Sequence, residues 1–390
     1  MISLISPQYE LVLSWIGESS AAGAALGCIY YVLASYLVIR FRMRRASVRR
    51  DDGDASPPMT VLKPLRGAEP RLLGRLSSFC IQKYDGPIQL VFGTHDCTDP
   101  AIEVVKRLQA DFPEQSITLK IDPQEHGANR KISNLVNMMP LAKNEILIVA
   151  DSDIEVGPHY YSSVVRELKR NGVGAVTCLY HGVAEAGLWS RLSALTINSY
   201  FLPQVILALS FRLAQPCFGS TIAIRRSTLT SVGGFQAFSD VLADDYAIGE
   251  AVRACGQAVV VPPMSVAHVC LDNDFRSMMQ QQLRFARTIR SIDPLGYVGS
   301  IITHPFPLAL IGASSGSTSC LYLAALALGC RVLACVSVER AFRLNWQHYW
   351  LIPIQDIISF GAYLGSYMGR TVVWREQRYR VLQDGGLVQE

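Results

Sequence analysis

The stretch Glu145-Ile146-Leu147-Ile148-Val149-Ala150-Asp151-Ser152-Asp153 decides the fold of this chain. Its apolar run is typical of a short strand buried inside a sheet, and two carboxylates follow the run directly. Open α/β sheets bind ligands at the carboxyl edge of their strands. Mg²⁺ and Mn²⁺ prefer carboxylate and phosphate oxygens, so Asp151 and Asp153 are candidates to hold such a cation with a nucleotide diphosphate. An acidic surface turn has the same pattern, and the neighbouring motifs must distinguish the two.

Strand-like and helix-like segments alternate around this stretch. The strand-like segments are residues 60–62, 88–94, 116–121, 145–150 and 174–178, and the helix-like segments are residues 70–82, 99–111, 130–141 and 158–171. This alternation predicts an α/β fold with a mostly parallel, doubly wound sheet. We expect one such domain over residues 59–293, preceded by a polar linker at residues 46–58.

The N-terminal region is predicted to be a membrane anchor within residues 1–45. No charged residue lies between Glu18 and Arg40, and residues 21–39 are long enough to cross a bilayer as a helix. Arginines follow at positions 40, 42, 44, 45, 49 and 50. This basic cluster predicts that the next segment faces the cytosol. A cleaved signal peptide carries its positive charge before the apolar run, so a signal anchor is favoured here.

A second membrane region is expected over residues 294–370, followed by a basic cytosolic tail at residues 371–390. Spans are predicted at residues 308–330 and 349–368, and Pro305 and Pro307 indicate a short interfacial or re-entrant piece before them. Two spans would return the tail to the cytosol but place Arg331 on the far side, so the number of spans stays open.

Residues 192–213 are apolar but interrupted by Asn198, Pro203 and Arg212. A helix lying at the bilayer surface and a buried core helix both fit this segment.

Composition excludes several other classes of protein. The ten cysteines contain no CxxC pair, so neither a zinc site nor a disulfide framework is indicated. The net charge of +4 is mild, and the arginine run after the first apolar segment fits membrane topology and anionic lipid. We therefore expect no nucleic-acid partner.

Further polar clusters are expected near the same sheet edge. Asp96 follows the strand-like segment 88–94, where it would accept from a nucleobase or ribose or would cap a helix. Arg130 and Lys131 begin a helix after Gly127 and are suited to phosphate or uridine, although a solvated helix start has the same pattern.

Two clusters later in the chain add a base and cations. Asp244 and Asp245 begin a predicted helix, where one carboxylate would take a proton from an acceptor hydroxyl or would simply interact with the helix dipole. Gln281, Arg284 and Arg287 share a helix face suited to a diphosphate, and a basic helix at a membrane surface is the alternative.

In order and spacing, four of these clusters resemble the D, DxD, (E)D, (Q/R)xxRW pattern of family 2-like inverting glycosyltransferases. They are Asp96, Asp151-Ser152-Asp153, Asp244-Asp245 and Gln281-x-x-Arg284-Phe285. Within that group, three stretches resemble the ceramide glucosyltransferase family, family 21: Leu62-Lys63-Pro64-Leu65-Arg66-Gly67, Leu242-Ala243-Asp244-Asp245-Tyr246 and Leu283-Arg284-Phe285-Ala286-Arg287. Three others are similar to its bacterial branch that glycosylates hopanoid lipids: Gly127-Ala128-Asn129-Arg130-Lys131, Thr177-Cys178-Leu179-Tyr180 and Arg287-Thr288-Ile289-Arg290.

The resemblance implies a GT-A fold and a UDP-sugar donor. It implies that Asp96 contacts uridine, that Asp151 and Asp153 serve ribose and a Mg²⁺ or Mn²⁺ ion, and that Lys131 helps to bind the nucleotide sugar. Asp245 would be the base beside Asp244, and Gln281 with Arg284 would hold the diphosphate. The chain departs from the pattern in two places, because Phe285 replaces the usual Trp and Asp244 the frequent Glu.

The implied reaction is the inverting, metal-dependent transfer of GlcNAc or glucose to a hydroxyl of a membrane lipid. The implied acceptor is a hopanoid such as bacteriohopanetetrol, with ceramide as the alternative. The implied location is the bacterial inner membrane, with the catalytic domain in the cytosol. A processive polysaccharide synthase shares the four motifs but needs more membrane spans. A non-catalytic sugar-nucleotide-binding membrane protein would not need Asp245.

Overall fold

The computed structural model describes residues 7–43, 56–345, 347–369, 371–374, 377–381 and 387–389, with side chains described from residue 14 to residue 371. Most of the predicted linker and the arginines at positions 44, 45, 49, 50, 370 and 375 lie outside the described residues. The chain forms two compact units. One comprises Met1–Arg44, Ala184–Leu213 and Leu271–Glu376, and the other Arg45–Val183, Ala214–Cys270 and Gln377–Glu390. The predicted domain 59–293 contributes residues to both.

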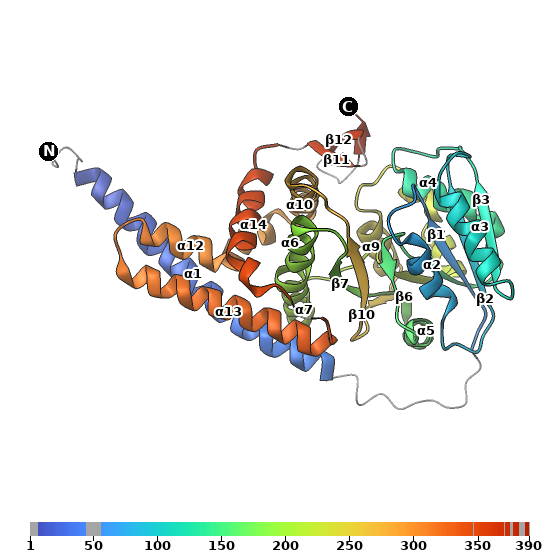
Figure 1. Ribbon diagram of the computed structural model, residues 1–390, viewed down its shortest axis with the longest axis horizontal. Helices are drawn as coiled ribbons and strands as arrows, with labels where there is room; N and C mark the ends of the chain where they lie inside the picture. Colours follow the sequence, from blue (N-terminus) through green and yellow to red (C-terminus); the bar gives the residue numbers. More distant parts are fainter. Residues whose placement is uncertain are drawn as a thin grey trace. The chain divides into compact units, whose positions relative to one another are not determined.

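The second unit is built on a seven-stranded sheet of order β3-β2-β1-β4-β8-β6-β9. Figure 1 labels β1, β2, β3 and β6 of this sheet. Its strands are β1 (Met59–Pro64), β2 (Ile88–Thr94), β3 (Ser116–Ile121), β4 (Ile146–Val149), β6 (Val173–Thr177), β8 (Ile222–Arg225) and β9 (Ala258–Val260). Strands β1 to β4 pair in parallel, whereas β8 runs antiparallel to both β4 and β6. The predicted α/β fold is thus confirmed, with one antiparallel strand that was not predicted.

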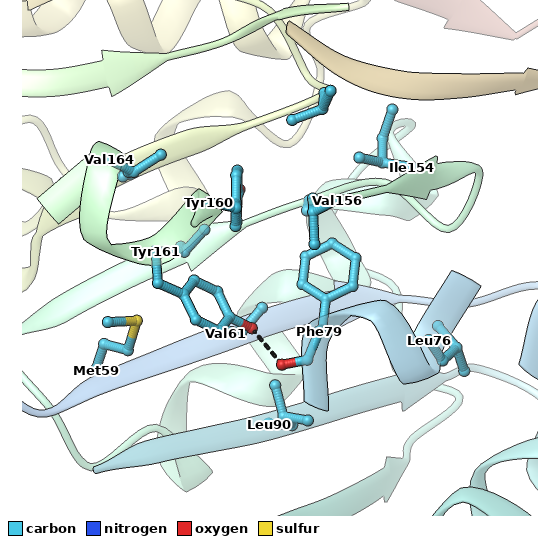
Figure 2. Packing of buried hydrophobic residues seen from close by; sticks show 14 of the residues in the cluster. Met59, Val61, Leu76, Phe79, Leu90, Ile154, Val156, Tyr160, Tyr161 and Val164 are labelled. Atoms are coloured by element: carbon cyan, nitrogen blue, oxygen red, sulfur yellow. Dashed lines mark hydrogen bonds between the residues drawn. The ribbon is translucent and has the colours of Figure 1, made fainter. Parts of the chain in front are cut away.

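Helices cover both faces of this sheet because its central strands are apolar on both sides. One face packs against α2 (Leu72–Cys80), α3 (Ala101–Asp111) and α5 (Tyr160–Leu168), and the other against α4 (Arg130–Met138), α8 (Arg226–Ser231) and α9 (Asp244–Ala254). Successive residues of a strand point to opposite faces of the sheet. Val61 and Ile148 pack in the core on the first face, and Leu62 and Leu147 pack in the core on the second. In the first core the Tyr161 hydroxyl donates to the Phe79 carbonyl oxygen (Figure 2).

A small second sheet lies beside the carboxyl end of β4. It has the order β5-β10-β7, with β5 at Ile154–Glu155, β7 at Leu179–Ala184 and β10 at Ser265–Cys270. His268 of β10 pairs with Ile154 of β5, next to Asp153. Strands β12 (Gln377–Val381) and β13 (Leu387–Gln389) pair antiparallel near the C-terminus.

The first unit is helical. Its helices are α1 (Pro7–Met43), α6 (Leu188–Thr196), a π-helical turn (Ile197–Phe201), α7 (Leu202–Phe211), α10 (Phe275–Ile292), α11 (Pro294–Gly299), a 3₁₀ turn (Ser300–Thr303), α12 (Pro305–Ala313), α13 (Thr318–Phe342), a further 3₁₀ turn (Tyr349–Leu351) and α14 (Ile352–Ser366). Strand β11 follows at Thr371–Trp374.

Among the described residues, three helices are long and apolar enough to cross a membrane: Ser14–Met43, Leu188–Phe211 and Thr318–Phe342. A pair bent by 65°, Pro294–Thr303 with Pro305–Ala313, would add a fourth span if it acts as one. The bend agrees with the predicted re-entrant piece at Pro305 and Pro307. These helices indicate a membrane protein and confirm the expected apolar helices near both ends.

The bounds of three predicted segments need correction. The expected span 308–330 is interrupted, because α12 ends at Ala313 and Gly316 takes a positive φ of 87° before α13 begins. The expected span 349–368 is a short turn followed by the 15 residues of α14, too short to cross a bilayer. The segment 192–213, which we expected to form a surface or core helix, lies largely within one of the candidate spans, Leu188–Phe211.

Small residues on α1 allow α12 and the 3₁₀ turn before it to approach closely. A Cβ atom added to Gly27 would lie 2.3 Å from the Ile302 carbonyl oxygen, and one added to Gly23 would lie 3.2 Å from Leu308. Such small-residue contacts are how apolar helices associate where the hydrophobic effect is weak.

Candidate active site

A buried lysine holds the backbone of the turn that carries the two carboxylates after β4. The Lys63 ammonium, on β1, donates to the Asp151 carbonyl oxygen at 2.8 Å and lies 3.7 Å from the centre of the Phe79 ring. Burial lowers the pKa of Lys63 to about 7, although Asp153 and Asp151 oppose this shift. Lys63 therefore fixes the backbone of the Asp-Ser-Asp turn through its side-chain amine.

Asp153 lies against β10. Its carbonyl oxygen accepts from the Val269 N–H at 2.9 Å, and its Oδ2 atom lies 3.6 Å from Nδ1 of His268. Its Oδ1 atom is buried and has no hydrogen-bond partner among the described residues. A buried carboxylate oxygen is costly unless a cation or a donor satisfies it.

This arrangement fits a divalent cation. Asp151, Asp153 and His268 supply two carboxylates and one imidazole. Mn²⁺ accepts both kinds of ligand, whereas Mg²⁺ prefers the carboxylate oxygens. Among the described residues, no three His, Cys, Asp or Glu side chains form a preassembled metal site. A cation there would therefore depend on additional oxygen ligands, which the phosphates of a nucleotide diphosphate supply.

Lys131 joins the Asp-Ser-Asp turn to the acidic pair on α9. Its ammonium lies 2.8 Å from Asp151 Oδ1 and 3.3 Å from Asp244 Oδ2. Burial alone would lower the pKa of Lys131, but Asp151, Asp244 and Asp245 outweigh burial and raise it. Lys131 therefore stays charged at all working pH values.

Asn129 places Lys131 in this position. Its side-chain oxygen caps α4 by accepting from the Ile132 N–H at 3.1 Å, and its amide donates to the Val241 carbonyl oxygen and to Asp244 Oδ1 at 2.8 and 3.2 Å. The cap thereby ties the start of α4 to the start of α9. Asp244, at 5% exposure, is held from two sides.

Asp245 is held in a different way, by backbone groups. Its Oδ2 atom accepts from the Gly219 N–H at 2.7 Å, and its Oδ1 atom accepts from the Tyr246 N–H at 2.8 Å. Burial and the neighbouring Asp244 raise the pKa of Asp245 to about 6, against the opposing effect of Lys131. A carboxylate with a pKa near 6 accepts a proton more readily than an ordinary aspartate and is still ionised at pH 7.

The charged groups converge on Gly219. A Cβ atom added to this glycine would lie 2.9 Å from Asp151 Oδ2, 3.0 Å from the Lys131 ammonium and 3.5 Å from Asp245 Oδ2. The turn at Gly219 thus forms one wall of a site in which the Asp151 carboxylate, a fixed cation and a candidate base face a common point.

Asp96 lies at the end of β2, as predicted, but is exposed and does not cap a helix. Its Oδ1 atom accepts from the Thr98 N–H at 2.8 Å and from the Thr98 hydroxyl at 2.7 Å, and these bonds lower the pKa of the carboxyl group. Asp99 holds the start of α3 instead, by accepting from the Ala101 N–H. Asp96 is therefore ionised and available to accept from a ligand.

Gln281 and Arg284 belong to the helical unit. Both lie on α10, where the Gln281 amide, in the orientation that lets it donate, is 3.2 Å from both carboxylate oxygens of Asp272. The Arg284 guanidinium lies 5.0 Å from the centre of the Phe285 ring. Arg287 donates instead to the Thr371 carbonyl oxygen, so this member of the predicted face holds the backbone after α14.

Four residues of the site were not singled out as functional from the sequence: Lys63, Asn129, Gly219 and His268. Lys63 and Asn129 fall within two of the stretches that carry the family resemblance, but the contacts of Lys63, Asn129 and Gly219 depend on neighbours far away in sequence. His268 had no sequence signal, because a histidine in the strand-like run Val266-Ala267-His268-Val269 resembles an ordinary strand residue.

The match to a family model extends over nearly the whole chain. The model described as "Glycosyl transferase family 21" matches residues 20–387. The chain belongs to glycosyl transferase family 21. Two ceramide glucosyltransferases are among the similar proteins. Ceramide glucosyltransferase 1 of Caenorhabditis elegans is 24% identical, over 62% of this chain and 52% of that protein. The ceramide glucosyltransferase of Gibberella zeae is 28% identical, over 41% of this chain and 33% of that protein. These matches therefore span about half or less of those relatives.

The fold has a counterpart among solved structures. The mannosyltransferase PcManGT of Pyrobaculum calidifontis, solved in complex with GDP-Man and Mn²⁺, aligns with 89% of this family 21 chain and 99% of its own, with a TM-score of 0.51 and 20% identity. The expected GT-A fold is thereby confirmed.

Proposed function

We propose that this family 21 protein transfers a sugar from a UDP-sugar to a hydroxyl group of a membrane lipid, with inversion at the anomeric carbon. The observation that carries the proposal is the convergence of Asp151, Lys131 and Asp245 on Gly219. A binding module has no need of a base, and Asp245 is a carboxylate with a raised pKa within this convergence.

The reaction is a single displacement. The acceptor oxygen bonds to the anomeric carbon as the bond from that carbon to the diphosphate oxygen breaks. The acceptor proton passes to Asp245, and such general-base catalysis contributes about 10²- to 10⁴-fold in rate. A Mg²⁺ or Mn²⁺ ion held by Asp151 and Asp153 with His268 would neutralise charge on the leaving diphosphate. Lys131 supplies a fixed positive charge beside Asp151 from the protein itself.

The remaining assignments follow from the order of the motifs. Asp96 would bind the uridine, and Gln281 with Arg284 would hold the diphosphate, for which an arginine fork is well suited. The base would be Asp245 and not Asp244, because Asp244 is engaged by Asn129 and Lys131.

The acceptor is proposed to be a lipid because ceramide glucosyltransferases are among the relatives and candidate membrane helices form one unit of the chain. Hopanoids such as bacteriohopanetetrol are the proposed class, on the motif resemblance, and ceramide is the alternative. The proposed location is the bacterial inner membrane with the catalytic residues in the cytosol, where UDP-sugars are available. The arginines after α1 support this orientation.

The test is UDP release by the purified protein in detergent with Mn²⁺ or Mg²⁺. UDP-GlcNAc and UDP-glucose would each be offered with bacteriohopanetetrol or ceramide, and products would be identified by mass spectrometry. The expected result is one lipid monoglycoside, with the anomeric configuration inverted. A polymer would favour a processive synthase, and UDP binding without any product would contradict the proposed activity on these acceptors.

A further inference from the structure

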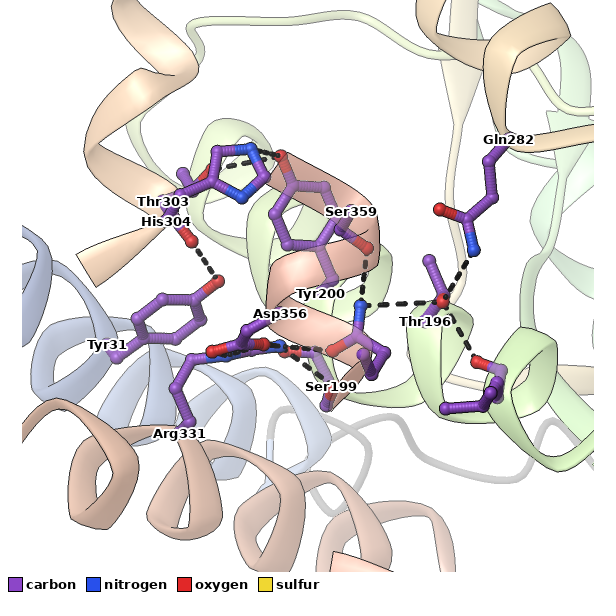
Figure 3. A network of polar contacts seen from close by, with 12 residues as sticks. Tyr31, Thr196, Ser199, Tyr200, Gln282, Thr303, His304, Arg331, Asp356 and Ser359 are labelled. Carbon is purple, nitrogen blue, oxygen red and sulfur yellow. Dashed lines mark hydrogen bonds and ion pairs between the residues drawn. The ribbon is translucent and has the colours of Figure 1, made fainter. Parts of the chain in front are cut away.

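Within the helical unit, an ion pair is fully buried between two apolar helices. Arg331 on α13 has 0% exposure and Asp356 on α14 has 3%. The Arg331 Nε–H lies 2.9 and 3.0 Å from the two carboxylate oxygens, and the Nη2 group donates to Oδ1 at 2.7 Å (Figure 3). Charged groups at such depth are rare and usually functional in membrane proteins.

The pair is completed by groups from neighbouring helices. Arg331 also donates to the carbonyl and hydroxyl oxygens of Ser199, in the π-helical turn, and to the side-chain oxygen of Gln355 at 2.9 Å. The guanidinium therefore fixes the position of Gln355 on α14, whose amide nitrogen is left to donate elsewhere.

Thr196 links Gln355 to α10 through hydrogen bonds to its hydroxyl oxygen. Its hydroxyl donates to the Leu192 carbonyl oxygen at 2.9 Å, which leaves the lone pairs of the hydroxyl oxygen to accept. The Gln355 amide approaches that oxygen at 3.4 Å. The Gln282 amide approaches it at 3.5 Å (Figure 3). These two bonds are long, so each contributes little, but they join α14, α6 and α10 at one atom.

Most residues of α10 are half-buried or exposed. Met278 is its one fully buried residue, and it packs with Leu192, Leu195, Leu351 and Ile352. Gln282 lies one turn further along the helix, directly after Gln281 and two residues before Arg284. The contact between Gln282 and Thr196 therefore helps to set the rotation of the helix segment that carries the two proposed diphosphate-binding residues.

We propose that Thr196 is a positioning residue for the sugar-nucleotide donor: through Gln282 it holds α10 in the orientation that Gln281 and Arg284 require, and the buried Arg331–Asp356 pair holds Gln355 in place to support it. This inference rests on the proposed function, because it assigns a consequence to the proposed diphosphate-binding role of Gln281 and Arg284.

The decisive variant is Thr196→Val, which keeps the shape of the side chain and removes the acceptor oxygen. Loss of these two long hydrogen bonds together should raise both the KM for the UDP-sugar and the Kd for UDP with Mn²⁺ by about 3- to 10-fold, which corresponds to about 0.7–1.4 kcal/mol in total. The kcat at saturating donor should change by less than about twofold, because Thr196 is assigned no contact with the reacting atoms. Thr196→Ser retains the hydroxyl and should restore wild-type values.

Ser210→Ala is the matched control, because the Ser210 hydroxyl donates to the Ile206 carbonyl oxygen of its own helix. It should leave the KM and Kd unchanged. Gln282→Met removes the same bond from the other side, and should reproduce the Thr196→Val effect if that variant folds poorly. A stable Thr196→Val protein, or a stable Gln282→Met protein, with the wild-type Kd for UDP would overturn the inference. If the wild type binds UDP but transfers no sugar, the proposed activity fails while the Kd comparison still decides the inference.

Discussion

The Lys131 ammonium lies 2.8 Å from Asp151, so a residue in the first turn of α4 is in direct ionic contact with the carboxylate that follows β4. The same ammonium reaches Asp244 at 3.3 Å. One lysine therefore connects the proposed metal-binding turn with the acidic pair Asp244 and Asp245, which includes the proposed base. A substitution in the turn should therefore alter the electrostatics of the acidic pair, and the reverse.

Asp245→Asn should lower kcat by about 10²- to 10⁴-fold, because the amide cannot take the proton of the acceptor hydroxyl. UDP binding should stay close to that of the wild type, since Asp245 accepts from the Gly219 and Tyr246 N–H groups and is assigned no contact with the nucleotide. Steady-state kinetics and calorimetric titration with UDP and Mn²⁺ measure the two effects. Turnover near the wild-type rate would refute the assignment of Asp245 as base.

The pH dependence of kcat/KM should report the raised pKa of Asp245. The base must be ionised to work, and its pKa is about 6, so activity should fall as pH drops through 6, by about tenfold per pH unit well below it. Above pH 7 this group should impose no further change. The profile is measured at constant ionic strength with saturating metal. An acidic limb near pH 4, the ordinary range of aspartate, would contradict the burial described for this carboxylate.

Gly219→Ala should block the site. The added methyl group would lie 2.9 Å from Asp151 Oδ2 and 3.0 Å from the Lys131 ammonium, closer than carbon atoms normally approach such groups. We expect the affinity for UDP to fall by at least about tenfold, because overpacking costs on the order of 1–3 kcal/mol and here the crowded atoms belong to the site. The melting temperature should change little. Gly157→Ala is the control in the same unit, because no atom lies within 4 Å of its added Cβ. Equal effects of the two substitutions would remove the special role of Gly219.

His268→Ala should raise the Mn²⁺ concentration needed for half-maximal UDP binding by about 10- to 100-fold, the range seen when groups supporting a metal site are lost. The physical reason is the position of its Nδ1 atom, 3.6 Å from the proposed metal ligand Asp153. His181→Ala tests a second histidine of the small sheet, whose Nδ1 atom pairs with the Ser265 hydroxyl at 2.9 Å. Metal requirements that match in the wild type and both variants would argue against His268 as a ligand.

Lys63→Met should flatten the dependence of stability on pH. The folded state lowers the pKa of Lys63 from its ordinary value of 10.5 to about 7, so between these values the unfolded chain binds more protons. Stability of the wild type should therefore rise with pH across this window, by at most about 1.4 kcal/mol per pH unit from this group. The substituted protein lacks this contribution, so the melting temperature of the wild type should rise relative to that of the variant between pH 7 and pH 9. A constant difference would show that Lys63 is not desolvated as described.

Much of the α/β core could be predicted from the sequence because buried strands are continuous apolar runs. Strands β2 and β3 begin and end where the pattern predicted, at Ile88–Thr94 and Ser116–Ile121. Strand β8 was missed since its four residues, Ile222–Arg225, are short and follow an irregular turn around Gly219. Its antiparallel pairing with β4 depends on a partner distant in sequence.

The candidate span Leu188–Phe211 was not predicted from the sequence, because its polar residues and its proline are accommodated by tertiary contacts that the sequence does not show. Asn198 donates to the Gln347 side chain at 2.8 Å. Pro203 cannot donate to the carbonyl oxygen of Ser199, four residues earlier in the helix, and that oxygen accepts from Arg331 instead. The acidic clusters were recognised because carboxylates after strands and at helix starts form local patterns. Lys63 and His268 were not, since a residue's role as counter-ion or ligand depends on which strand lies beside it.

The glycine face of α1 has a consequence for preparing the protein. Gly27 and Gly23 admit the backbone near Ile302 and the Leu308 side chain so closely that α1 is an integral part of the helical unit and more than a tether. A shortened protein that begins after Met43 would leave Pro305 and Leu308 facing solvent or lipid in place of a helix. We expect such a protein to aggregate or to require more detergent, so the first helix should be retained in any preparation meant for kinetics.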